Sequence, residues 1–273
     1  MSFNSISFKN VLVDIEDHVM ILTINRPAKM NALDPLTHRE MAEAMENFAA
    51  DDDLWVAIVT GAGEAAFCAG GDLSSMQGNF DDNEEQEYTV PDSGYGGITN
   101  RFDCDKPVIA AVNGFAAGGG FEIVMACDLA VACDLASFGL PEPKVGVVAY
   151  AGGMHRLPRT LTSKRAMEIL LTGDFIDADT ALNWGLINEV VPADQLMTAA
   201  KVWAQRVLKC SPVAIRATKQ VVRKGLNNVS VEDAMAGQER GDYLALSEWS
   251  ASHDTKEGID AFVQKRSPEW RNS

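Results

Sequence analysis

Three successive glycines, Gly118 to Gly120, constrain the fold of this chain most strongly, because they run directly into an apolar segment that carries one acid. The stretch from 113 to 134 is NGFAAGGGFEIVMACDLAVACD, and the acid is Glu122. Glycine runs cost backbone entropy and leave peptide N–H groups uncovered, so they occur where the main chain turns sharply or approaches something closely. A tight turn and a helix from about Gly119 to Ala126 are therefore predicted. Glu122 either caps this helix or takes part in chemistry.

Hydrophobic patterns place this segment within a strand–helix–strand rhythm. The apolar runs, each predicted to form a strand or hairpin, lie at residues 11–27, 54–60, 107–114 and 129–133. Met41, Ala44, Met45 and Phe48 recur at helical spacing and predict an amphipathic helix from Pro35. The tripeptides VTG and VNG, which end two of the strands, favour stacked β-β-α units. The pattern predicts an α/β fold.

The chain changes character after Pro192. Four segments are predicted to be helices, at residues 193–209, 213–224, 231–248 and 255–265. We therefore expect a mixed core over residues 1–191 and a helical region over 192–273. Within the core, residues 76–97 are acidic, bear glycine and lack apolar periodicity, which predicts a long mobile loop.

Composition excludes several classes of partner. Asp and Glu outnumber Lys and Arg by 39 to 23, a net charge of −16, which argues against nucleic acid and anionic membranes. The five cysteines form no C-x-x-C pair and are odd in number, which favours a reduced, cytoplasmic setting. We find neither a basic and apolar leader nor an apolar run of about eighteen residues.

Motifs for other chemistries fail on inspection. Residues 61–66, GAGEAA, satisfy the dinucleotide pattern, but FCAGGDL follows where a helix should open on the pyrophosphate. There is no P-loop lysine motif and no H-E-x-x-H, so neither a metal nor a cofactor is expected. The four histidines are scattered and are interpreted as surface or core residues: His18, His38, His155 and His253.

The glycines instead predict a site for a carbonyl oxygen. The first-turn N–H groups of a helix that begins near Gly119 are unsatisfied, and the helix dipole adds positive potential. Gly70 and Gly71, in AFCAGGDL, leave another uncovered N–H in a turn that also follows a core strand. The two turns together are expected to hold one carbonyl, such as that of a thioester that becomes enolate-like, where losing one donor costs roughly 3 to 4 kcal/mol of barrier.

Two acids are candidates for proton transfer beside that carbonyl. Glu122 falls at the end of the first helical turn, where a glutamate also makes an ordinary capping interaction. Glu142, in the proline-flanked turn SFGLPEPKVG, is placed at the edge of the same predicted core and favours the catalytic interpretation. Two neighbouring carboxyl groups have pKa values that are pushed apart, so that one donates while the other accepts.

The sequence closely resembles the enoyl-CoA hydratase/isomerase (crotonase) superfamily over essentially its whole length. The matching motifs, in order, are NRPAKMNAL, AFCAGGDL, KPVIAAVNGFAAGGGFEIVMACDLAVAC, FGLPEPKVG, AGGMHRLPR, GLINEVVP and EGIDAFVQKRSPEW. The resemblance implies a spiral of repeated ββα units followed by a C-terminal helical trimerisation region. It also implies a homotrimer or homohexamer whose substrate is an acyl-CoA thioester, with coenzyme A belonging to the substrate rather than acting as a cofactor.

By this resemblance the oxyanion donors are the backbone N–H groups of Gly71 and Gly119, and the hydratase acids are Glu122 and Glu142. Glu122 is expected to orient and deprotonate water, and Glu142 to exchange the proton at Cα. The implied reaction is reversible addition of water to a 2-enoyl-CoA, giving a 3-hydroxyacyl-CoA. The alternatives are an isomerase, a dehydratase of a modified acyl group, and a non-catalytic acyl-CoA-binding member.

The resemblance also implies contacts to coenzyme A, whose phosphates need local cations on so acidic a protein. The implied residues of the core are Arg26, Ala28, Lys29, Ala69, Gly70, Asp72 and Leu73. Lys265 on the tail is expected to reach a neighbouring subunit's ligand, and Phe262 to contact adenine. Solvated lysines and ordinary helix packing of Phe262 are the alternatives.

One segment departs from the hydratase pattern just after Glu142. This chain has VVAYAGG where many members carry a proline and a glycine before AGG, which places Tyr150 there. A phenol brings bulk and a hydrogen-bonding tip, so Tyr150 is predicted to form part of the acyl-pocket wall. The alternative is a tyrosine that packs outward.

Overall fold

The computed structural model describes residues 7–76 and 88–273. These form two compact units, one holding the described residues up to 102 with residues 108–204, and the other holding 103–107 with 205–273. The division falls within helix α7 (Leu196–Leu208), whereas the sequence analysis places its boundary at residue 191. In the described parts of the chain, no helix has the length and apolar character that crossing a membrane requires.

A six-stranded sheet forms the centre of the first unit. Its strand order is β1 (Val11–Glu16), β2 (Val19–Ile24), β3 (Val56–Gly61), β5 (Val108–Val112), β7 (Leu129–Cys133) and β10 (Glu189–Val191). The β1–β2 pair is an antiparallel hairpin, and the other neighbours are parallel. Every residue of β3 and β5 is buried, as is usual for parallel strands covered on both faces. The predicted hairpin and strands are confirmed.

A second, four-stranded sheet explains the ββα rhythm. It contains β4 (Ala66–Cys68), β6 (Phe115–Ala117), β8 (Ser137–Gly139) and β9 (Phe175–Asp177). Successive repeats give their first strand to the large sheet and their second to the small one. Strands β3 and β4 lead into α2 (Leu73–Met76), and β5 and β6 lead into α3 (Gly119–Ala126). The predicted spiral of ββα units is therefore what the chain forms, and α3 has the predicted bounds.

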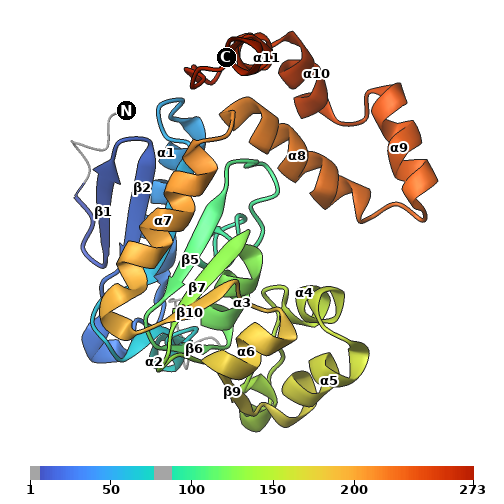
Figure 1. Cartoon of the computed structure of the whole chain (residues 1–273). Helices are drawn as coiled ribbons and strands as arrows, with labels where there is room; N and C mark the ends of the chain where they lie inside the picture. The colour runs from blue at the N-terminus through green and yellow to red at the C-terminus, as the bar shows by residue number, and fades with distance from the viewer. Residues whose placement is uncertain (1–6, 77–87) are drawn as a thin grey trace. The chain divides into compact units, whose positions relative to one another are not determined.

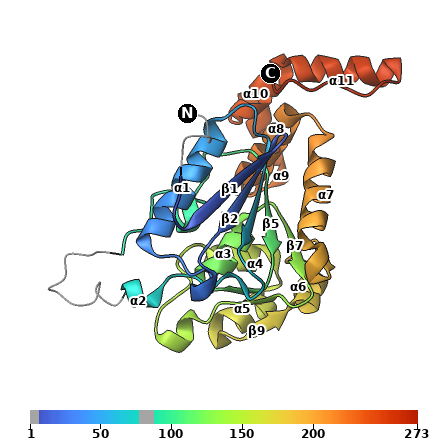
Figure 2. The same ribbon diagram turned by 90° about the vertical axis from the view of Figure 1, so that its left-hand side faces the viewer.

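Helices cover both faces of the large sheet (Figure 2). Helix α1 (Pro35–Ala50) lies on one face and α7 runs along the other, where Lys201 Nζ pairs with Glu16 of β1 at 2.7 Å. Asp34 caps α1 by accepting the Thr37 N–H at 2.8 Å, next to a proline at the first helical position. The remaining helices of this unit are α4 (Gly153–Thr160), α5 (Ser163–Thr172) and α6 (Ala178–Trp184).

The acidic segment 76–97 differs from its prediction. Residues 77–87 lie outside the described residues; Thr89, Val90 and Asp92 are exposed, but residues 94–97 are packed against the core. They end in a short 3-10 helix, Tyr95–Gly97, in which Gly96 and Gly97 have positive φ and are buried. A Cβ on Gly97 would lie 2.4 Å from Ala42 Cα, so glycine allows the backbone to touch α1. Those glycines, which the sequence analysis treated as loop residues, are packing residues.

The second unit is helical (Figure 1). It contains α8 (Pro212–Gly225), α9 (Val231–Arg240), α10 (Leu244–Ala251) and α11 (His253–Gln264). The single helix predicted over 231–248 is wrong, because Gly241 has a φ of 79° and ends α9, and Tyr243 caps α10. The last residues return to α11, where buried Asp254 accepts the N–H groups of Arg271 at 2.8 Å and Asn272 at 3.2 Å.

Candidate active site

Two glycine turns, one from each of two successive repeats, meet at the candidate site. Gly70 has a φ of 88°, and a Cβ there would lie 2.9 Å from Ala117 O and 3.2 Å from the Gly119 nitrogen. The turn after β4 is therefore in direct contact with the turn before α3. The N–H groups of Gly71 and Gly119 donate to no other described residue. Both predicted carbonyl-binding groups thus lie in neighbouring turns and are available.

Each glycine of the opening motif lacks room for a side chain, for a different reason. A Cβ on Gly118 would lie 3.0 Å from Glu142 Oε1, and one on Gly119 would lie 2.4 Å from a ring carbon of Tyr95. A Cβ on Gly120 would lie 2.0 Å from the Cys68 carbonyl oxygen. The backbone approaches a carboxylate, an aromatic ring and a strand in succession, which is why three glycines stand together.

Glu122 is buried in the first turn of α3, with 2% of its surface exposed. Its Oε1 accepts the N–H of Gly153, at the start of α4, at 2.7 Å. In a capping interaction it would instead accept the N–H of Gly118, but that N–H donates to Gly139 O at 2.9 Å. The capping alternative is wrong, and the carboxyl group is held toward α4.

Glu142 enters the site from a 3-10 helix, Glu142–Val145, that follows β8. Its Oε1 faces Gly118, and its buried Oε2 has no hydrogen-bond partner among the described residues. A buried polar atom without a partner is rare and costs free energy. Burial raises the pKa of this carboxyl above its usual value. The carboxyl group therefore holds its proton to a higher pH than an exposed glutamate does.

Burial also raises the pKa of Glu122, to about 7, and the neighbouring charge of Glu142 contributes in the same direction. The Gly153 N–H and the Arg156 guanidinium oppose the rise but do not cancel it. A group that titrates near neutrality exchanges protons readily in both directions. The pair therefore has the electrostatic character expected of an acid and a base at one site.

Arg26 has a role that the sequence analysis did not expect. Its guanidinium pairs with Asp72 at 3.0 Å and Asp34 at 3.1 Å, and it donates to the Ala32 carbonyl oxygen. Two carboxylates already neutralise its charge, which disfavours the expected contact between Arg26 and a coenzyme A phosphate. The ion pairs instead connect the start of α1 to the turn Gly70–Asp72, which carries Gly71.

The two predicted coenzyme A segments of the core do lie side by side. The Ala69 N–H donates to Met30 O at 3.1 Å, and the Leu33 N–H donates to Gly70 O at 2.8 Å. Ala28 and Lys29 are exposed on the 3-10 helix Pro27–Lys29, and Leu73 is 61% exposed. Lys29 thus remains accessible beside the turn that carries Gly70.

Three other predicted residues lie at exposed positions. In the second unit, Phe262 is 83% exposed and Lys265 follows the end of α11, so helix packing does not account for Phe262 within the protomer. Tyr150 is 87% exposed, while its neighbours Ala149 and Ala151 are buried. The backbone turns the two alanines inward and the tyrosine outward. The inward-facing Tyr150 predicted from the sequence is not found.

Sequence reasoning missed His38 and Tyr95, which pack together beside Gly119, and Arg156, whose charge acts on Glu122. His38 stands three residues before Met41, on the buried face of α1, and this spacing was a signal of its burial. Tyr95 carried no such signal. No group of three His, Cys, Asp or Glu side chains in the described ranges is arranged to hold a metal ion.

A spiral of ββα repeats that places two N–H groups without an acceptor among the described residues beside two carboxyl groups defines a class of enzyme. Such an enzyme holds a carbonyl oxygen while protons move at neighbouring carbons. The chain belongs to the enoyl-CoA hydratase/isomerase family, whose model matches residues 14–273. The family resemblance expected from the sequence motifs is confirmed.

Individual relatives cover nearly the whole chain. The carnitinyl-CoA dehydratase of Citrobacter koseri is 42% identical over 253 residues, which are 93% of this chain and 95% of that protein. The carnitinyl-CoA dehydratase of Proteus mirabilis is 40% identical over 253 residues, again 93% of this chain and 95% of that protein. The crystal structure of an enoyl-CoA hydratase from Mycobacterium tuberculosis has a TM-score of 0.87 and 37% identity, and covers 97% of this chain and 99% of that one. The names of these relatives, dehydratase and hydratase, describe enzymes that remove or add water.

Proposed function

We propose that this enzyme catalyses the reversible addition of water across the Cα–Cβ bond of a 2-enoyl-CoA thioester, giving a 3-hydroxyacyl-CoA. The observation that carries the proposal is the placement of Glu122 and Glu142 beside two glycine N–H groups that have no other described acceptor. A protein that only bound acyl-CoA would need the N–H groups but not the two acids, and the burial of Glu122 costs free energy.

The N–H groups of Gly71 and Gly119 hold the thioester oxygen. When water adds at Cβ, the π electrons move toward Cα and the carbonyl, and negative charge collects on that oxygen. Fixed donors stabilise this enolate more than the ground-state carbonyl, because they require no reorganisation during the step. Gly119 also stands at the N-terminus of α3, so the helix dipole adds to the effect.

The two carboxyl groups divide the proton transfers. Ionised Glu122, oriented by the Gly153 N–H, takes a proton from the water as its oxygen bonds to Cβ. Protonated Glu142 delivers a proton to Cα, which restores the carbonyl. One proton has then moved from water to Glu122 and one from Glu142 to carbon, so exchange with solvent returns both groups to their starting states. Dehydration follows the same steps in reverse.

The substrate is tested with a panel of thioesters. Hydration of 2-enoyl-CoA thioesters removes the absorbance of the conjugated double bond, and dehydration of 3-hydroxyacyl-CoA thioesters creates it. Glu122→Gln and Glu142→Gln are each expected to lower kcat by at least about a hundredfold while leaving coenzyme A binding intact. Wild-type protein that binds the thioesters without changing their absorbance would overturn the hydratase proposal and leave the binding alternative.

A second candidate is dehydration of carnitinyl-CoA, which the identity of 40 to 42% to proteins of that name favours. The same carboxyl groups serve it, because the reaction also removes water from a 3-hydroxyacyl thioester. Including carnitinyl-CoA in the panel ranks the two candidates by kcat/KM. A 3-enoyl-CoA that gains conjugated absorbance without forming a hydroxyacyl product would instead favour the isomerase alternative.

We also propose that Lys29 contributes a cation to the coenzyme A phosphates, because it is exposed next to the Gly70 turn while Arg26 is already paired. Lys29→Ala is expected to raise KM for an acyl-CoA several-fold and leave kcat nearly unchanged, since it removes binding that is the same in the ground and transition states. The matched control is Lys164→Ala, an exposed lysine of α5. Equal KM values for both variants and the wild type would contradict this role.

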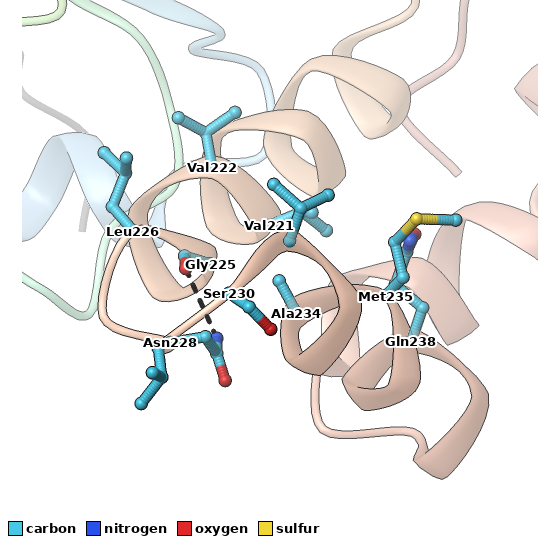
Figure 3. A pocket seen from close by; sticks show the side chains of 11 residues that line it. Val221, Val222, Gly225, Leu226, Asn228, Ser230, Ala234, Met235 and Gln238 are labelled. Carbon is cyan, nitrogen blue, oxygen red and sulfur yellow. Dashed lines mark hydrogen bonds between the residues drawn. The ribbon is translucent and has the colours of Figure 1, made fainter.

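Finally, we propose assembly into a homotrimer or homohexamer through the helical unit. A groove of about 550 Å³ opens between α8 and α9 (Figure 3). The apolar side chains of this surface are largely exposed in the protomer, at Val222, Leu226, Val229, Val231 and Met235. So large an exposed apolar patch typically marks an interaction site. Light scattering is expected to give three or six times 29.5 kDa, and a monomer mass at assay concentration would contradict the proposal.

A further inference from the structure

A chain of hydrogen bonds connects the two sides of the carbonyl-binding site through His38. The Gly96 N–H donates to His38 Nδ1 at 3.2 Å, so Nδ1 carries no proton and Nε2 does. His38 Nε2 then donates to the Tyr88 hydroxyl at 2.8 Å, and that hydroxyl donates to Leu33 O at 2.8 Å. Every link has one donor and one acceptor, which fixes the orientation of the imidazole ring.

One end of this chain reaches the turn that carries Gly71. The Leu33 oxygen that accepts from Tyr88 also accepts the Asp72 N–H at 2.9 Å, and the Leu33 N–H donates to Gly70 O at 2.8 Å. Leu33 therefore holds the residues on both sides of Gly71. A displacement of Leu33 would move the Gly71 N–H with it.

The other end reaches Gly119. The Gly96 N–H belongs to the same 3-10 helix as Tyr95, whose ring packs edge to face on His38 with centroids 4.7 Å apart. The Tyr95 ring in turn lies against Gly119, where a Cβ would come within 2.5 Å of two ring carbons. His38 is thus linked through Tyr88 to the segment that holds Gly71, and it contacts Tyr95, the residue that covers Gly119.

We propose that His38 is a positioning residue that sets the relative placement of the two carbonyl-binding N–H groups. The inference rests on the proposed function, because the spacing of these donors has chemical meaning only if they hold a carbonyl. A displacement of about 1 Å between reacting groups and the groups that orient them can cost a hundredfold in rate. His38 itself touches no reacting atom, and it acts through Leu33 and Tyr95.

The burial of His38 supports this role. Its side chain is fully buried, and this burial lowers the pKa of the imidazole to about 4, although the charge of Asp34 acts in the opposite direction. The ring is therefore neutral under ordinary conditions and keeps one acceptor and one donor nitrogen. The Gly96 N–H needs an unprotonated Nδ1 as its acceptor, and the Tyr88 hydroxyl needs the proton on Nε2. A doubly protonated ring could not accept from Gly96.

The test separates positioning from general stability. His38→Phe keeps an aromatic ring and loses both hydrogen bonds. Tyr88→Phe removes the hydroxyl that links His38 to Leu33 and that also hydrogen-bonds Tyr95, and His38→Gln can still donate to Tyr88. The matched control is His18→Phe, because His18 also bonds the backbone, at the Asp53 carbonyl oxygen at 2.6 Å, and packs on an aromatic ring, that of Trp55, in another part of the first unit.

Turnover is measured together with a carbonyl-polarisation signal. The probe is a para-dialkylaminocinnamoyl thioester of coenzyme A, whose absorption maximum moves to longer wavelength when donors polarise its carbonyl. His38→Phe and Tyr88→Phe are each expected to lower kcat by about 10- to 100-fold, with KM within about threefold, and to reduce the spectral shift of the bound probe. His38→Gln is expected to recover part of both signals, and His18→Phe to match the wild type.

Two results would overturn the inference. If Tyr88→Phe folds and keeps both the kcat and the full shift of the wild type, the connection does not position the donors, whatever happens to His38→Phe. If His38→Phe fails to fold, Tyr88→Phe and His38→Gln decide the matter alone. Wild-type protein that shows neither turnover of any thioester nor a shift would refute the proposed function, and this inference with it.

Discussion

Replacing Glu122 by glutamine is expected to stabilise the protein at alkaline pH while it removes activity. The side chain is 2% exposed, and burial raises its pKa from 4.5 to about 7. Glutamine keeps an oxygen that can accept the Gly153 N–H and removes the charge. The wild-type carboxylate therefore carries a burial penalty that the variant does not have.

The size of this effect follows from the pKa. A rise from 4.5 to about 7 corresponds to about 3 kcal/mol of free energy between the ionised and neutral forms. The pKa of Glu122 is higher in the folded state than in the unfolded state. The free energy of unfolding is therefore highest below pH 4.5, where the carboxyl group is protonated in both states, and it falls as the pH rises through 7. Relative to the wild type, Glu122→Gln should thus gain up to about 3 kcal/mol between pH 5 and pH 8.

Urea unfolding of both proteins at several pH values measures this difference. Protein concentration must be the same throughout, because assembly contributes to apparent stability. Glu64→Gln is the matched control, since Glu64 is exposed and its replacement removes the same charge without relieving burial. A difference between Glu122→Gln and wild type that stays constant from pH 5 to pH 8 would refute the reasoning, because the buried carboxyl would then not be titrating.

Three further expectations follow from the site. Because Glu122 must be ionised to accept a proton from water, hydration kcat/KM should rise through about pH 7, and the residual activity of Glu122→Gln should lack this rise; an unchanged pH dependence in the variant would show that another group titrates. Arg26→Leu should cost about 2 kcal/mol in urea unfolding with little change in KM, since it leaves Asp34 and Asp72 unpaired; a large rise in KM would restore the phosphate-binding role. Tyr150→Gly should leave the kcat/KM ranking of the thioester panel unchanged, because the ring is 87% exposed, and an altered ranking would place it in the acyl pocket.

The sequence predicted those parts of the fold that depend on local signals. Apolar runs bounded by turns marked the strands, and the glycine motif placed the start of α3 at Gly119, as the structure has it. The glycines also predicted the two turns that meet at the site, because glycine runs occur where the main chain turns sharply or approaches something closely. The catalytic interpretation of Glu122 depended on the second acid, and the Gly153 contact now excludes the capping alternative.

Long-range partners could not be predicted in the same way. Arg26 stood in a motif that suggested a phosphate ligand, but its carboxylates come from residues 8 and 46 positions away, which no local pattern brings together. Tyr95 lay in a segment without periodicity, and only the folded chain shows that Gly96 and Gly97 pack it against α1. The outward orientation of the Tyr150 side chain depends on a turn in which its neighbours Ala149 and Ala151 are buried and the tyrosine is not.

The crowding around Gly118, Gly119 and Gly120 also limits how such an enzyme can diversify. Every side chain begins with a Cβ, and that atom would collide with Tyr95 at Gly119 and with the Cys68 backbone at Gly120. At Gly118 it would press on the Glu142 carboxyl group in a backbone conformation, with a φ of 52°, that favours glycine. No single substitution at the three glycines can therefore be the first step toward a new activity, since each damages the carbonyl-binding turn before it can alter selectivity. New substrates must be accommodated by residues around this turn. Directed-evolution libraries should accordingly leave the glycine motif constant and vary its neighbours, of which Tyr95 packs directly on the motif.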